Sequence, residues 1–93
     1  MPDLLFEIWK DDENRSTQMG MVHPQGDRAR LFVSPNAVLV HSFSARSDFE
    51  AFRHNNDWQG FEPWMPPEGL EEHFFTEEEV AVQQAYLRER KPA

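Results

Sequence analysis

The stretch LLFEIWK, residues 4–10, predicts the strand around which the fold is built. Its side chains alternate between two faces, with the period of a β-strand. One face is wholly apolar and consists of Leu4, Phe6 and Ile8. The other face carries Leu5, Glu7 and Trp9.

A polar loop and a second strand follow this stretch. Residues 11–16 are charged or polar, and residues 17–23 again favour a strand. Two pairs compete for the inward face of this strand: Met19 with Met21, or Gln18 with Val22. Because the loop is so short, we expect the two strands to form an antiparallel hairpin.

Residues 27–34 are compatible with two different structures. A helix over residues 28–33, capped by Asp27 and ended by Pro35, is favoured because its first residues are good helix formers. A strand over residues 30–33 is the alternative.

The middle of the chain predicts a strand followed by a helix. Residues 37–43 are nearly continuously apolar, so we expect this strand to lie centrally in the sheet. The sequence Ser47-Asp48-Phe49-Glu50 matches a capping box and predicts a helix over residues 47–56. We expect Phe49 and Phe52 to form the buried stripe of this helix.

An irregular stretch follows, which we call the aromatic–proline segment (residues 57–75). Three prolines and two glycines within residues 58–69 exclude a regular helix or a central strand there. Thr76-Glu77-Glu78-Glu79 then forms a second capping box, which opens a C-terminal helix over residues 76–90. The apolar face expected for this helix consists of Ala81, Val82, Ala85 and Tyr86.

Together these elements predict a single α+β domain over residues 1–93. Residues 1–45 are expected to form mainly sheet, and helices flank the aromatic–proline segment. We expect a small three- or four-stranded, mostly antiparallel sheet with two or three helices on one face. Eight Phe, three Trp and one Tyr can fill its core without metal or disulfide.

The composition argues against several classes of function. The absence of cysteine excludes disulfides, thiol nucleophiles and iron–sulfur ligation. The net charge is −8, and residues 47–79 hold ten acids against one base, Arg53. Direct nucleic-acid binding needs clustered Lys and Arg, so we do not expect it. No apolar run approaches a membrane span and no signal-peptide pattern is visible, so a cytoplasmic protein without membrane contact is expected.

The middle of the chain resembles a set of small bacterial proteins that have no assigned activity. The resemblance rests on the run Pro35-x-Ala37-x-Leu39-Val40-His41-x-Phe43-x-Ala45-x-Ser47-x-x-Glu50-Ala51, followed by Asp57-Trp58-x-Gly60-x-x-Pro63-Trp64. It covers roughly a third of the chain. It implies a bacterial source and a compact free-standing domain, and it implies no activity.

Four histidines are the candidates for metal or proton chemistry: His23, His41, His54 and His73. None has the spacing of a zinc motif. One hypothesis is a divalent-cation site built from His54, Asp57 and His73. Another is that His41, inside a predicted strand, acts as a general base. Ordinary structural roles are favoured over both, so no catalytic residue, metal or cofactor is predicted.

The aromatic–proline segment is the strongest candidate for binding. Trp58, Phe61 and Trp64 recur every three residues among prolines, which gives rigid apolar surface at low entropic cost. The competing interpretation is that these side chains cover the open sheet face as core. Leu87 lies away from the expected apolar face of its helix and is a second candidate contact.

The leading hypothesis is therefore a non-enzymatic binding or protein-interaction module, with a protein partner or a second copy of the chain. A small His-based or metal-dependent enzyme is one alternative. An acidic partner or decoy of a basic protein is the other.

Overall fold

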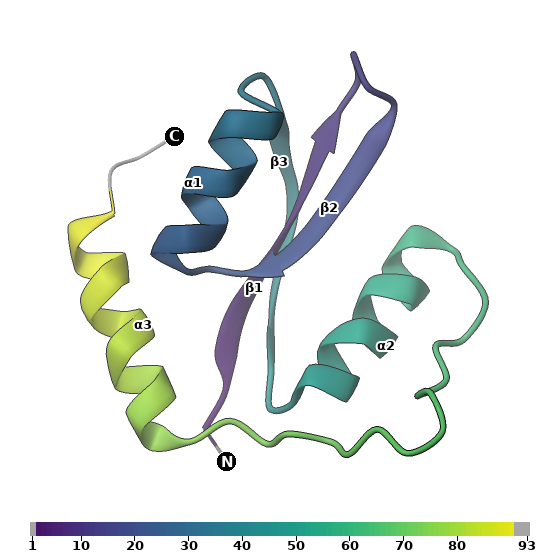
Figure 1. The fold of residues 1–93 in the computed structure, drawn as a ribbon, viewed down its shortest axis with the longest axis vertical. Helices are drawn as coiled ribbons and strands as arrows, with labels where there is room; N and C mark the ends of the chain where they lie inside the picture. The colour runs from purple at the N-terminus through teal and green to yellow at the C-terminus, as the bar shows by residue number, and fades with distance from the viewer. Residues whose placement is uncertain (1, 91–93) are drawn as a thin grey trace.

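The computed structural model describes residues 2–90. Its elements follow in the order β1 (Leu4–Asp11), β2 (Ser16–Met21), α1 (Pro24–Val33), β3 (Val38–Ala45), α2 (Asp48–Gln59) and α3 (Glu77–Glu89). The strands form one antiparallel sheet in the order β2-β1-β3 (Figure 1). The predicted α+β class is confirmed. None of the helices among these residues is long and apolar enough to cross a membrane.

The helices lie on both sides of the sheet, which corrects the expectation that they share one face. Figure 1 shows α1 and α3 on one side of the strands and α2 on the other. The reason lies in β1, whose two faces both carry large side chains. The face of Phe6 and Ile8 packs against α2, whereas Trp9 lies under Arg30 of α1. A strand that is apolar on one face and holds an acid and an indole on the other needs cover on both.

β1 is the central strand because β2 and β3 pair with its two edges. Phe6 lies between Met21 of β2 and Phe43 of β3 in this register. The predicted hairpin of β1 with the next strand is confirmed, although β2 ends at Met21 rather than at His23.

The main core lies between β1, β3 and α2. Its buried members are Leu4, Phe6, Ile8, Phe43, Ala45, Ala51 and Phe75, with Met19 and Val80 packed against them. The Phe6 ring lies 5.5 Å from that of Phe43 and 5.9 Å from that of Phe75. Burying one such ring stabilises the fold by about 2 kcal/mol.

β3 is an edge strand, so the prediction that residues 37–43 lie centrally is wrong. Only β1 pairs with it. The apolar side chains that suggested a central strand, Val38, Leu39 and Val40, are exposed. A continuous apolar run fits either a strand that is buried on both faces or an edge strand whose apolar side chains are exposed. The pattern alone does not distinguish these two.

The helix expected over residues 28–33 is confirmed, but it begins earlier, at Pro24. His23 caps it, because its Nδ1 accepts a hydrogen bond from the Gln25 N–H at 3.2 Å. Proline suits the first helical position, which needs no N–H donor. Asp27 lies within the helix, so its predicted role as cap is wrong. The strand alternative for this region is wrong as well.

Ser47 caps α2 as predicted, since its Oγ accepts from the Glu50 N–H at 3.1 Å. The Glu50 carboxylate reaches back one residue further than in a capping box and accepts from the Arg46 N–H at 3.1 Å. α2 extends to Gln59, beyond the expected end at residue 56, and Gly60 ends it with φ 76°. Phe49 is buried as expected, whereas Phe52 is exposed.

The buried face of α3 differs from the one predicted. The Thr76 capping box is present, but the buried side chain is Gln83, and of the predicted face only Tyr86 is partly buried. The exposed members are Ala81, Val82 and Ala85. The Gln83 amide accepts a hydrogen bond from the Leu5 N–H at 2.8 Å and donates to the carbonyls of Leu5 and Val22, both at 3.0 Å. The Gln83 amide thus hydrogen-bonds to the backbone of β1 at Leu5, just beyond the end of β2. This contact sets the orientation of α3.

Asp11 organises the hairpin loop between β1 and β2. Its carboxylate accepts from the Asn14 side chain at 2.7 Å and from the backbone N–H groups of Glu13 and Asn14 at 3.0 and 3.2 Å. The hydrogen bond from the Asn14 side chain is the main reason that the pKa of Asp11 lies below its ordinary value.

Replacing Asp11 with asparagine should lower the urea midpoint at neutral pH. A depressed pKa in the folded state means that Asp11 stabilises the fold above its ordinary pKa and loses this effect as the pH falls through the folded value. The difference between wild type and Asp11→Asn should therefore shrink between pH 7 and pH 3. Asp12→Asn, in the exposed part of the loop, is the control. A constant difference at both pH values would contradict this role.

Candidate functional site

The aromatic–proline segment begins inside α2 and then leaves it. Trp58 lies in the last turn of α2, so the expectation of irregular structure from residue 57 onward is wrong for its first three residues. The left-handed conformation of Gly60 turns the chain out of the helix. The chain then runs along the lower edge of the molecule to α3 (Figure 1).

Trp64 fixes this segment to α2. Its ring meets the edge of Phe49 and stacks on Phe52, with both centroids 5.0 Å away. A hydrogen bond from the Asn56 side chain to the Glu62 carbonyl, 3.1 Å long, holds the chain beside the helix. This part of the segment is therefore held in place beside α2, and only the last residue of the segment, Phe75, belongs to the buried core.

Several large apolar side chains of the segment remain exposed to solvent. Phe61 is 56% exposed and Met65 is 77% exposed. Leu70 and Phe74 are about half exposed. The interpretation of the segment as simple core cover fits Trp64 in part and does not fit these four residues.

The four predicted binding residues do not form one cluster. Trp58 stacks on His41 of β3 at 4.7 Å, and Trp64 packs against the opposite flank of α2. Phe61 is exposed on the loop. Leu87 is half-buried on α3.

His41 and His54 form a pair that the sequence did not predict. Their Nε2 atoms lie 2.9 Å apart, and their rings are nearly parallel, with centroids 5.1 Å apart. Phe43 stacks on His54 at 4.0 Å and Trp58 covers His41, so the pair is part of an aromatic stack between β3 and α2. Such a hydrogen bond requires that at least one of the two imidazoles is neutral.

The hypothetical site of His54, Asp57 and His73 is not assembled. His54 contacts His41, whereas His73 binds the Glu79 carboxylate at 2.9 Å. Within residues 2–90, no group of three or more His, Cys, Asp and Glu side chains is placed to hold a metal ion.

The pKa of the Glu79 carboxylate, which caps α3, is changed by the groups around it. Partial burial works to raise the pKa of Glu79, but the hydrogen bonds from the Thr76 N–H and from His73 outweigh it and hold that pKa below its ordinary value. Both bonds keep the start of α3 in place, so His73 has a structural role here.

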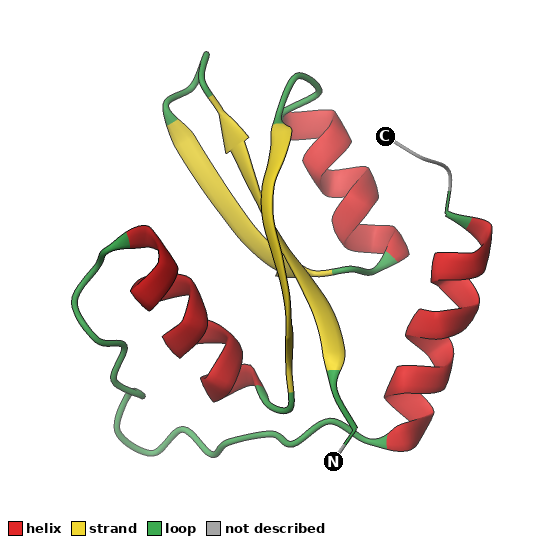
Figure 2. Cartoon of the chain, turned by 180° about the vertical axis from the view of Figure 1, so that it is seen from behind, coloured by secondary structure: helices red, strands yellow, loops and turns green. Residues whose placement is uncertain are grey.

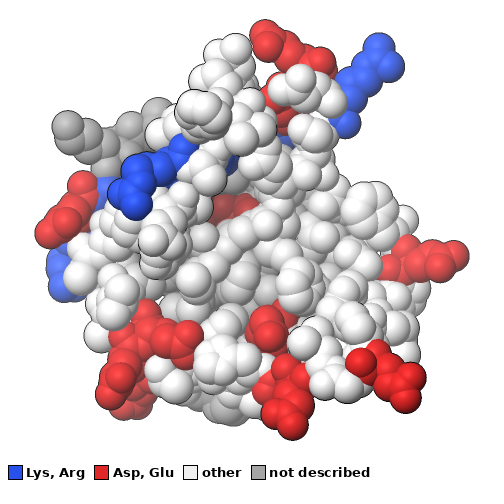
Figure 3. All heavy atoms as spheres, viewed as in Figure 1, with Lys and Arg blue, Asp and Glu red and all other residues white. Residues whose placement is uncertain are grey.

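The aromatic–proline segment itself holds Asp and Glu but no Lys or Arg. Between Arg53 and Arg88 there is no Lys or Arg, whereas eight acids occur there. Figure 3 shows acidic groups along the lower edge, where Figure 1 places the loop between α2 and α3, and further acidic groups at the top and at both sides. The basic side chains in the same view lie away from this edge (Figure 3).

A hollow of about 330 Å³ lies between α3 and the junction of β2 with α1. Leu4, Met21, Val22 and Val82 contribute apolar wall, and Glu78 and Glu79 lie at its side. None of the predicted binding residues lines it.

Comparisons of the chain with protein-family models, curated proteins and solved structures found no match. The resemblance to small bacterial proteins therefore stays a prediction, and the function has to be inferred from the chain's own surfaces.

Proposed function

We propose that this chain is a non-enzymatic protein-interaction module that binds a basic, apolar stretch of a partner protein through the aromatic–proline segment. The observation that supports this most is the exposure of Phe61, Met65, Leu70 and Phe74 on a chain segment that is itself held in place. Several exposed apolar side chains within one short segment are typical of interaction sites.

Preorganisation favours binding by this segment. Trp64 packs on Phe49 and Phe52, and the prolines restrict the backbone before any partner arrives. Less conformational entropy is then lost on association. Phe61 and Met65 supply apolar contact area at little further cost.

The charge of the segment selects the partner. Acids such as Glu62, Glu68 and Glu71 flank the exposed apolar groups, and no Lys or Arg lies in between. Lys or Arg side chains next to apolar residues complement such a surface, and acidic partners are repelled. The acidic and the aromatic side chains of the segment thus serve the same function, which is to bind a partner stretch that is both basic and apolar.

The test uses a synthetic peptide that alternates lysine with leucine. Its addition should shift the backbone amide NMR signals of residues 61–74, and higher salt should weaken the binding. Phe61→Ser should reduce the affinity about ten-fold, because it removes an exposed aromatic contact.

Two controls make this result specific. Phe32→Ser makes the same change at a more exposed phenylalanine on α1 and should leave the affinity unchanged. The same peptide with glutamate in place of lysine should not bind. Equal losses for Phe61→Ser and Phe32→Ser, or equal binding of both peptides, would refute the proposal.

A further inference from the structure

A second candidate contact is β3, which lies in the longest run of the chain without Asp, Glu, Lys or Arg. The fifteen residues 31–45 contain no Asp, Glu, Lys or Arg, although 28% of the chain is charged. The next longest run without charge, residues 16–26, has eleven residues. The longer run covers the end of α1 and all of β3.

The outer edge of β3 is open along most of its length. Within residues 2–90, β3 pairs with β1 alone, and only beyond its end does Ser47 form a bridge with Phe74. Figure 2 shows β3 on the near side of the molecule, with α1 and α2 to either side of it and nothing drawn in front. Val38 beside this edge is 62% exposed.

This edge has few of the features that keep a sheet from pairing with another chain. Natural edge strands are protected by Lys, by Pro, by bulges or by covering loops. β3 has no Lys or Pro, and its one irregularity is at Val40, where the register with β1 shifts. The other edge strand, β2, is shorter and includes Thr17, Gln18 and Gly20.

We infer that β3 pairs antiparallel with β3 of a second copy, giving a two-fold dimer with one continuous six-stranded sheet. Antiparallel pairing of identical strands is self-complementary, so each copy offers the same surface to the other. It also places only uncharged residues opposite one another. Copies with a net charge of −8 repel one another, so a strand that holds no Asp or Glu is where they can approach.

Neighbouring side chains extend the contact beyond the strand itself. Trp58 stacks on His41 beside the edge and keeps 44% of its surface exposed. Phe32 and Val33, at the end of α1, are exposed only a few residues before β3 in the chain. A stable interface needs about 800 Å² from each partner, and such side chains are the type that contributes it.

Light scattering on a sizing column, over micromolar to millimolar protein, tests this inference. Wild type should have twice the 11.0 kDa chain mass. Val38→Lys should give the monomer mass, because a lysine on an edge strand opposes pairing with another chain. Val82→Lys is the matched control: Val82 is also 62% exposed but lies on α3, and this variant should stay dimeric.

Hydrogen exchange provides a readout that needs no variant. In wild type, amides of β3 should become more protected as the protein concentration rises, while those of β2 should not. A monomeric wild type, a growing polymer, or a monomeric Val82→Lys would each overturn the inference. Lysine–leucine peptide binding depends on a different surface, so its result stands whether or not the chain dimerises.

Discussion

Replacing Gln83 with leucine should lower the free energy of unfolding by about 3 kcal/mol, because a buried amide that completes the sheet is lost. Gln83 bonds to both backbone groups of Leu5 and to the carbonyl of Val22. Leucine fills nearly the same volume but leaves the Leu5 N–H and the Val22 carbonyl without these partners. Each buried polar group that loses its partner costs about 1–3 kcal/mol.

Urea denaturation of matched variants measures this effect. Gln84→Leu makes the same change at the adjacent, exposed position of α3 and should alter stability by less than about 0.5 kcal/mol. A loss of the same size in both variants would mean that helix propensity, and not the contact with β1, accounts for the effect.

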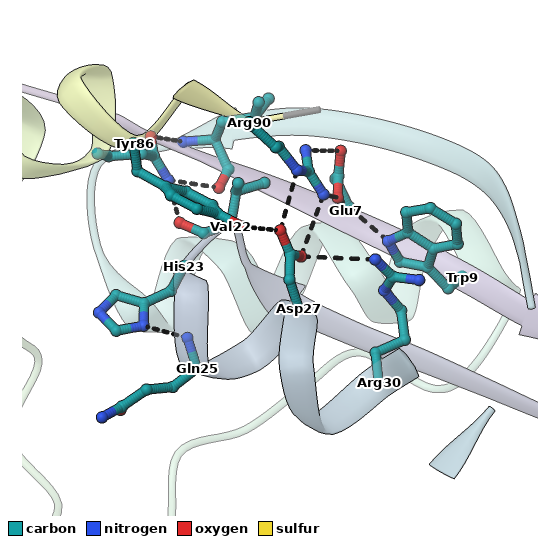
Figure 4. A network of polar contacts seen from close by, with 11 residues as sticks. Glu7, Trp9, Val22, His23, Gln25, Asp27, Arg30, Tyr86 and Arg90 are labelled. Atoms are coloured by element: carbon teal, nitrogen blue, oxygen red, sulfur yellow. Dashed lines mark hydrogen bonds and ion pairs between the residues drawn. The ribbon is translucent and has the colours of Figure 1, made fainter. Parts of the chain in front are cut away.

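Arg90→Met should have a second large effect, a loss of about 3 kcal/mol at neutral pH, because it leaves the buried Glu7 carboxylate without its cation, whereas Asp27 keeps an ion pair with Arg30. Figure 4 shows the Arg90 guanidinium between Glu7 and Asp27. It donates to the two oxygens of Glu7 at 2.7 and 2.9 Å and to those of Asp27 at 2.9 and 3.1 Å. Glu7 also accepts from the indole N–H of Trp9 at 3.1 Å, so the pair holds the end of α3 against β1.

The double variant Glu7→Gln with Arg90→Met separates charge from packing. It should be more stable than Arg90→Met alone, since the uncompensated Glu7 charge is then absent. Arg88→Met, on the exposed side of α3, is the control and should change little. A double variant as unstable as the single one would show that the lost guanidinium packing, and not the unpaired carboxylate, dominates.

The same network raises the pKa of two of its proton donors, Arg90 and Tyr86. The hydrogen bonds from Arg90 to Glu7 raise the pKa of Arg90 further above its already high value, against the effect of burial. The hydrogen bond that Tyr86 donates to Asp27 raises the pKa of Tyr86 above its ordinary value. A raised pKa in the folded state means that Tyr86 stabilises the fold below its ordinary pKa and loses this contribution as the pH rises through the folded value.

The helices and strands of this fold could be predicted from local sequence patterns, but the contacts between them could not. The alternation of residues 4–10 and the capping residues Ser47 and Thr76 depend on backbone geometry within a few residues. The contacts of Gln83 with Leu5 and of Arg90 with Glu7 join residues 78 and 83 positions apart. A glutamine in a helix gives no sign that it completes a distant strand.

The candidate site was predicted in part for the same reason. The exposure of Phe61 follows from its place in a segment that proline keeps out of regular structure. The separation of Trp58 from Trp64 does not, since it depends on α2 continuing for one more turn. β3 was placed wrongly because its apolar residues fit a buried strand as well as an open edge.

Hydrogen exchange at low and high protein concentration, each with and without the lysine–leucine peptide, tests the central claim that this chain works through two separate contact surfaces. The expected result is two footprints: peptide-dependent protection confined to residues 61–74, and concentration-dependent protection confined to β3. Protection that changes at neither place, or that follows the peptide and the concentration over the same residues, would contradict it.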